Sequence, residues 1–60
     1  MQNRVDATFI NRNDNVPYRR VYKNYNTFRA AVRRISSKAK FVSAIDYGNM
    51  RVVYPKDLMH

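Results

Sequence analysis

The chain has 60 residues, with twelve Lys and Arg against four Asp and Glu, one glycine and no cysteine. This length fits one small domain, residues 1–60, and without cysteine neither a disulfide nor a Cys-based zinc site can support it. No apolar run approaches the roughly 18 residues of a membrane span, and the N-terminus lacks a signal-peptide layout. We therefore expect a soluble cytoplasmic protein with no membrane partner, and a homodimer would be the simplest source of extra stability.

The first predicted element is a strand over residues 5–10. Val5, Ala7 and Phe9 fall on one face of it, and the polar residues between them fall on the other. The run 11–15 contains only Asn, Arg and Asp, which favours a loop because Asn and Asp bond to their own backbone. A hairpin to the next extended segment is expected.

That next segment, about residues 18–23, predicts a second strand. Pro17 lacks a backbone donor, which places it at a strand start or on a sheet edge. Alternation puts three residues on each face, but leaves open whether the tyrosines pack inwards or form an exposed aromatic platform. One face carries Tyr18, Arg20 and Tyr22, and the other carries Arg19, Val21 and Lys23.

An amphipathic helix is predicted over about residues 27–39. Asn24 or Asn26 can cap its first turn, and Lys38 and Lys40 at its end would suit the helix dipole. The cations on its polar face have no acidic neighbour on the helix, a small local cost that an external anion would relieve. The apolar stripe consists of Phe28, Ala31, Val32, Ile35 and Ala39.

A second hairpin is predicted around a two-residue turn at Gly48–Asn49. This turn would pair Asp46 with Arg51, so that opposite charges meet across the ladder. Pro55 would end the last strand, and residues 56–60 are expected to form a loose tail. The remaining predicted pairs are Tyr47 with Met50, Ile45 with Val52 and Ala44 with Val53, and one face carries Ile45, Tyr47, Met50, Val52 and Tyr54.

The predicted order β-β-α-β-β defines an α+β domain of two layers, with one helix packed on an antiparallel sheet. The pattern leaves the strand order open. It also leaves open a three-stranded sheet in which residues 5–10 are frayed or exchanged between two chains.

Residues for catalysis are few. His60 is the last residue, the four aspartates are scattered, and one glycine cannot build a phosphate-binding loop. No metal or cofactor site is expected. A nuclease working through Arg, Lys and Tyr alone is the weaker hypothesis, because general acid–base catalysis usually uses His, Glu or Asp. We therefore expect a protein that is not an enzyme.

The charge predicts an anionic partner. A net charge of +8 stands at the upper edge of the range of about 2–8 that is ordinary for a small soluble domain. The main hypothesis is a DNA- or RNA-binding protein. The alternative, by analogy of size and composition, is a phage-type inhibitor or adaptor that acts in the host cytoplasm on an acidic surface of a partner protein. The predicted binding residues are Arg19, Arg20, Tyr22, Lys23, Arg29, Arg33, Arg34, Lys38 and Lys40.

Overall fold

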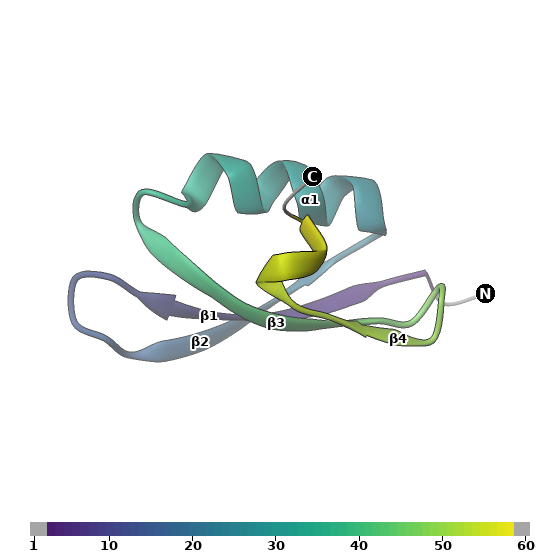
Figure 1. Cartoon of the computed structure of the whole chain (residues 1–60), viewed down its shortest axis with the longest axis horizontal. Coiled ribbons are helices and arrows are strands. Elements are labelled where there is room, and N and C mark those ends of the chain that lie inside the picture. The colour runs from purple at the N-terminus through teal and green to yellow at the C-terminus, as the bar shows by residue number, and fades with distance from the viewer. Residues whose placement is uncertain (1–2, 59–60) are drawn as a thin grey trace.

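The computed structural model of the protein describes residues 3–58, in which four strands form one antiparallel sheet. The strand order is β2-β1-β3-β4, and a helix and a short 3-10 helix lie over one face of the sheet (Figure 1). This confirms the predicted two-layer α+β fold. The elements are β1 (Val5–Asn11), β2 (Pro17–Tyr22), α1 (Tyr25–Ile35), β3 (Ala39–Asp46), β4 (Arg51–Val53) and η1 (Pro55–Leu58).

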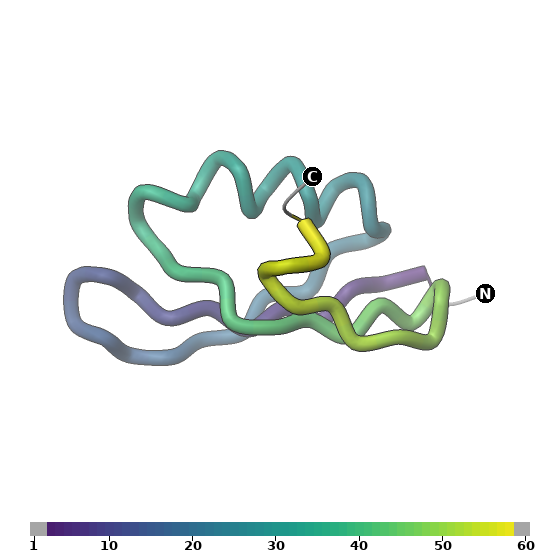
Figure 2. Tube along the Cα trace, in the orientation of Figure 1, coloured from purple at the N-terminus to yellow at the C-terminus, as the bar shows by residue number. Residues whose placement is uncertain are grey.

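Strand β1 lies at the centre of the sheet, paired with β2 on one side and with β3 on the other. Val5, Ala7 and Phe9 are fully buried beneath the helix, as the alternation predicted. The alternative of a three-stranded sheet with a frayed first strand is therefore wrong for this chain. Between β2 and β3 the chain crosses over the helix side of the sheet, so α1 covers the strand that separates them (Figure 2).

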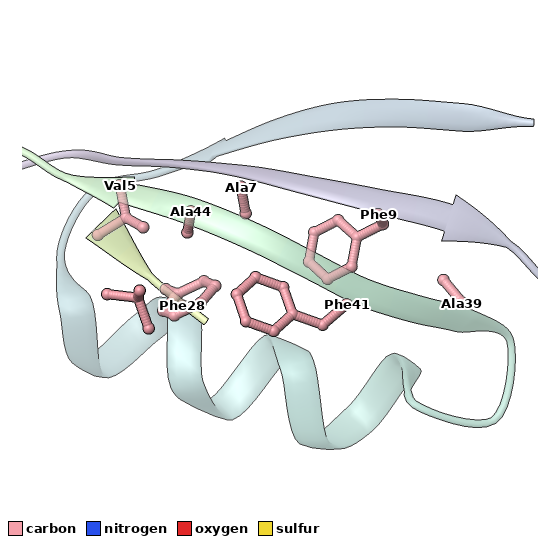
Figure 3. Close-up of a cluster of buried hydrophobic side chains, with 8 residues drawn as sticks. Val5, Ala7, Phe9, Phe28, Ala39, Phe41 and Ala44 are labelled. Carbon is pink, nitrogen blue, oxygen red and sulfur yellow. The ribbon is translucent and has the colours of Figure 1, made fainter. Parts of the chain in front are cut away.

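The core is built around three phenylalanines, one each from β1, α1 and β3 (Figure 3). The ring of Phe41 lies 5.3 Å from that of Phe28 and 5.8 Å from that of Phe9, in tilted or edge-on contacts that aromatic rings favour. Ala7 and Ala44 are paired in register and buried, and their small side chains leave room for the large ring from the helix.

Helix α1 begins two residues earlier than predicted and ends four residues earlier. Asn24 is its N-cap, and the Asn24 side chain accepts a 2.8 Å hydrogen bond from the backbone N–H of Thr27. The helix ends at Ile35 because two serines follow, and serine bonds readily to nearby backbone. The backbone N–H of Lys38 closes the turn on the carbonyl of Ile35 at 2.9 Å.

The placement of Ala39 and two lysines at the helix end is therefore wrong. Ala39 is buried as the apolar stripe required, but it is buried as the first residue of β3. Lys38 lies in the turn and Lys40 in β3. The basic residues of the last helical turn are instead Arg33 and Arg34, whose positive charges interact favourably with the C-terminal end of the helix dipole.

The β3–β4 hairpin has the predicted register, with Asp46 opposite Arg51 at its end, but the predicted pair Tyr47–Met50 lies in the turn and not in the ladder. The predicted two-residue turn is wrong, because residues 47–50 form a four-residue turn in which Met50 has a positive φ of 51°. The predicted and the observed turn are both centred on Gly48 and Asn49, so the strand register is the same. At Gly48 a Cβ would lie 3.1 Å from the side-chain oxygen of Asn3, and the absence of one allows this close approach.

Asp46 holds this turn together. Its carboxylate is 1% exposed and accepts a 2.9 Å hydrogen bond from the side chain of Asn49. The guanidinium of Arg51 lies 3.4 Å from the same oxygen and also covers the ring of Tyr25 at 4.9 Å. The hairpin is thereby tied to the first turn of α1.

The C-terminal segment differs from the expected loose tail. Residues 55–58 form η1, in which the carboxylate of Asp57 accepts a 2.8 Å hydrogen bond from the backbone N–H of Tyr54. Leu58 packs against the core. Residues 59 and 60, including His60, lie outside the described part of the chain. Within residues 3–58, no helix is both long and apolar enough to cross a membrane.

The cap of α1 leads to a stability prediction. Asn24→Ala should lower the free energy of unfolding by about 1 kcal/mol, because the N–H of Thr27 loses its side-chain acceptor. Asn26→Ala is the matched control, since Asn26 is exposed and lies within the first turn. Urea denaturation followed by circular dichroism measures both variants. An equal loss in the two variants would contradict the capping role.

Candidate functional site

The aspartates leave most of the positive charge unmatched. Asp6 pairs with Arg4 at 3.3 Å and Asp46 pairs with Arg51 at 3.4 Å. The other two aspartates accept backbone N–H groups within their own turns. Within residues 3–58 no cation of the segment 12–40 forms an ion pair, and that segment holds nine of the twelve Lys and Arg.

The register of β2 decides where the tyrosines lie. Tyr18, Arg20 and Tyr22 pair with the three fully buried residues of β1 and so face the helix. The ring of Tyr18 stacks on Phe9 at 5.5 Å, and the ring of Tyr22 lies 6.0 Å from that of Phe28. Both tyrosines are half-buried at the margin of the core. They are therefore not an exposed aromatic platform.

Two arginines from different elements act on the hydroxyl of Tyr22. Burial raises the pKa of this hydroxyl above its ordinary value, and the positive charges of Arg20 and Arg34 oppose that rise. The neighbouring hydroxyl of Tyr18 adds to it. Arg20 comes from β2 and Arg34 from the last turn of α1. The positive charges of one strand residue and one helix residue thus both act on the same phenol.

A hollow of about 560 Å³ continues from Tyr18 towards the β1–β2 turn. Arg12 and Lys38 both line it. The backbone N–H of Arg12 donates to the carbonyl of Lys38 at 3.0 Å, and its side-chain Nε donates to the carbonyl of Ser36 at 2.9 Å. Arg12 is therefore held in place by the end of the helix. The other residues lining this hollow are Asn11, Asn13, Ile35 and Ser37.

These two neighbourhoods share Tyr18 and form one surface along the edge strand and the C-terminal half of α1. We call this surface the basic groove. No acidic residue lines the hollow or contributes to the pKa shift at Tyr22. Four cations and two phenols from four segments of the chain therefore contribute to this surface without a carboxylate. The basic groove consists of Arg12, Tyr18, Arg20, Tyr22, Arg34 and Lys38.

The other predicted binding residues lie elsewhere. Arg29 and Arg33 line a separate hollow beside Leu58, on the side of the helix that η1 flanks. Arg19 and Lys40 pair with residues of β1 that point away from the helix, so they lie on the opposite face of the sheet. Lys23 is exposed in the bend between β2 and α1. The single predicted surface is thus several surfaces in the structure.

Two members of the basic groove were not among the predicted binding residues. Arg12 follows the first strand in a run of loop residues, and no local pattern distinguishes it. It meets Lys38 because the pairing of β1 with β3 brings the two turns together. The alternation along the strand places Tyr18 on the same face as Arg20 and Tyr22. It does not say whether the helix covers that face.

Comparison with known proteins gives no match to a family model, a curated protein or a solved structure. In the described part of the chain, no three side chains of the metal-ligating types His, Cys, Asp and Glu gather at one point.

The raised pKa of Tyr22 predicts a pH dependence of stability. The folded state holds this proton more tightly than the unfolded chain, whose tyrosines ionise near pH 10. The contribution of Tyr22 is therefore fully present below about pH 10 and is lost as the pH rises through the folded pKa. Wild-type protein should lose stability more steeply there than Tyr22→Phe, as measured by urea denaturation at a series of pH values.

The matched control for this titration is Tyr54→Phe, which removes a tyrosine hydroxyl from an exposed position. Its stability should follow the wild-type curve. Parallel curves for wild type and Tyr22→Phe would show that the Tyr22 hydroxyl does not lie in the environment described.

Proposed function

We propose that the protein binds nucleic acid through the basic groove, without catalysing a reaction. The observation that carries this proposal is that Arg12 and Lys38 line one hollow with Tyr18, while the charges of Arg20 and Arg34 act on the neighbouring Tyr22, with no carboxylate among these residues. In a folded chain such unmatched charges repel one another, and an anion placed between them removes that cost. Phosphate groups supply this charge at regular spacing along a nucleic-acid strand.

The chemistry of the groove favours contact with the sugar–phosphate backbone. Arginine presents a planar fork of N–H donors that matches two phosphate oxygens. The Tyr22 hydroxyl retains its proton at neutral pH and is available as a further donor. The raised pKa of Tyr22 also makes it a poor general base, which agrees with a binding role.

Base stacking is a minor part of the proposed interaction. The rings of Tyr18 and Tyr22 already pack on phenylalanines, so their faces are not free to receive bases. Contacts to phosphate position a protein on nucleic acid but carry no sequence information directly. We therefore expect binding with little sequence preference.

The groove arginines provide a direct test. Arg20→Gln/Arg34→Gln should weaken binding at least about tenfold and lower the slope of log K against log salt by about two, because two phosphate contacts are lost. Arg29→Gln/Arg33→Gln is the matched control, since it removes the same charge from the hollow beside η1. Gel shifts with duplex DNA, single-stranded DNA and structured RNA at two salt concentrations give the measurement.

The two double variants also define what would overturn the proposal. Equal weakening by both would mean that net charge, and not the groove, drives binding. If wild-type protein binds none of the three nucleic acids at low salt, the proposal is wrong. Retention of one stoichiometric acidic protein from nuclease-treated lysate would then favour the inhibitor or adaptor hypothesis.

The tyrosine hydroxyls give an independent prediction. Tyr18→Phe/Tyr22→Phe keeps both rings and removes both hydroxyls. If the hydroxyls donate to phosphate, affinity should fall by roughly 2- to 12-fold per hydroxyl, which corresponds to about 0.5–1.5 kcal/mol for each hydrogen bond. Stacking alone predicts unchanged affinity, because phenylalanine stacks as well. Fluorescence anisotropy with a labelled strand distinguishes the two outcomes.

A further inference from the structure

The sheet face opposite the helix is uncovered. In the described part of the chain α1 and η1 both lie on the other face (Figures 1 and 2). One row across the four strands holds Val21, Asp6, Ile45 and Val52, and its three apolar members are 66%, 44% and 50% exposed. Contiguous exposed apolar surface on a small protein marks an interaction site. With two further residues of this face it forms what we call the open-face patch, which consists of Ile10, Val21, Val42, Ile45 and Val52.

The open-face patch differs in charge from the rest of the molecule. The only charged member of the central row is Asp6, and Arg4 neutralises it at 3.3 Å. The Arg4 and Asp6 side chains are 46% and 28% exposed, so a layer placed over this face would cover them as an ion pair and not as isolated charges. Arg19 lies on the edge strand and Lys40 at the end of the sheet, where both can remain in water at a rim.

The area of this face matches the requirement of a small dimer. The chain exposes 4690 Å², whereas a monomeric protein of 7.2 kDa exposes about 4,100 Å² on average. A four-stranded face with strands about 4.8 Å apart covers on the order of 400 Å² in projection. Two such faces together bury roughly 1,000 Å², because side chains make the accessible area larger than the projected area. This is the lower bound for a specific interface.

We propose that two copies of this chain associate through the open-face patch, sheet against sheet, with both helices and both basic grooves on the outside. The centre of this face is apolar apart from one ion pair and fits an identical centre, while the unpaired cations Arg19 and Lys40 lie at its rim. A strongly acidic partner would instead favour the basic surfaces. In a two-fold symmetric dimer the same surface of each copy meets the other, and the open-face patch would be that surface on both copies. This inference does not depend on the proposed function.

Analytical ultracentrifugation tests the proposal. Wild-type protein should sediment as a species of about twice the 7.2 kDa chain mass at high concentration. Val52→Lys and Ile45→Lys place a charge in the patch and should give monomers. Val16→Lys is the matched control, because Val16 is 54% exposed but lies in the β1–β2 loop. This variant should remain dimeric, and circular dichroism should show the same fold in all four proteins.

Salt and concentration provide evidence that does not depend on the variants folding. Added salt should strengthen dimerisation by screening repulsion between two basic chains, whereas it weakens binding to nucleic acid. The thermal midpoint of the wild type should rise with protein concentration. A wild type that is monomeric at all concentrations would overturn the proposal. A dimer that survives Val52→Lys but is lost in Val16→Lys would also overturn it.

Discussion

The whole structure depends on β1 being paired on both edges. Its position between β2 and β3 requires the chain to cross the sheet after β2, and the crossing segment is the helix. The buried side of β1 then meets Phe28 from α1 and Phe41 from β3 in a single aromatic cluster. Because this cluster occupies one side of a thin sheet, the other side is left without a covering layer.

This arrangement separates two kinds of surface. Cations brought in by β2, α1 and the turn before β3 gather on the helix side, where the groove forms beside the edge strand. Exposed apolar side chains gather on the opposite face, in the row across β2, β3 and β4. The basic groove and the open-face patch therefore lie on different faces of a domain of 60 residues, so the two proposed interactions would not compete.

Sequence patterns predicted the elements well wherever the signal was local. The alternation in β1, the register of the second hairpin and a cap at Asn24 or Asn26, of which the structure uses Asn24, all depend on neighbouring residues. The errors came where two structures use the same residue pattern. Ala39 satisfies a helical stripe and a strand interior equally, and the serines before it ended the helix early. At the second hairpin the turn has four residues in place of the predicted two, and Met50 in it has a positive φ.

The candidate site was predictable only in its charge. By itself the sequence determined the β-β-α-β-β order and an excess of unpaired cations, because periodicity and composition are properties of the chain. Only the tertiary structure decided that the charges of Arg34 and Arg20 both act on Tyr22, while Arg33 lines a separate hollow. It also brought Arg12 to Lys38. These contacts depend on strand order and on which face the helix covers, and neither is recorded in local periodicity.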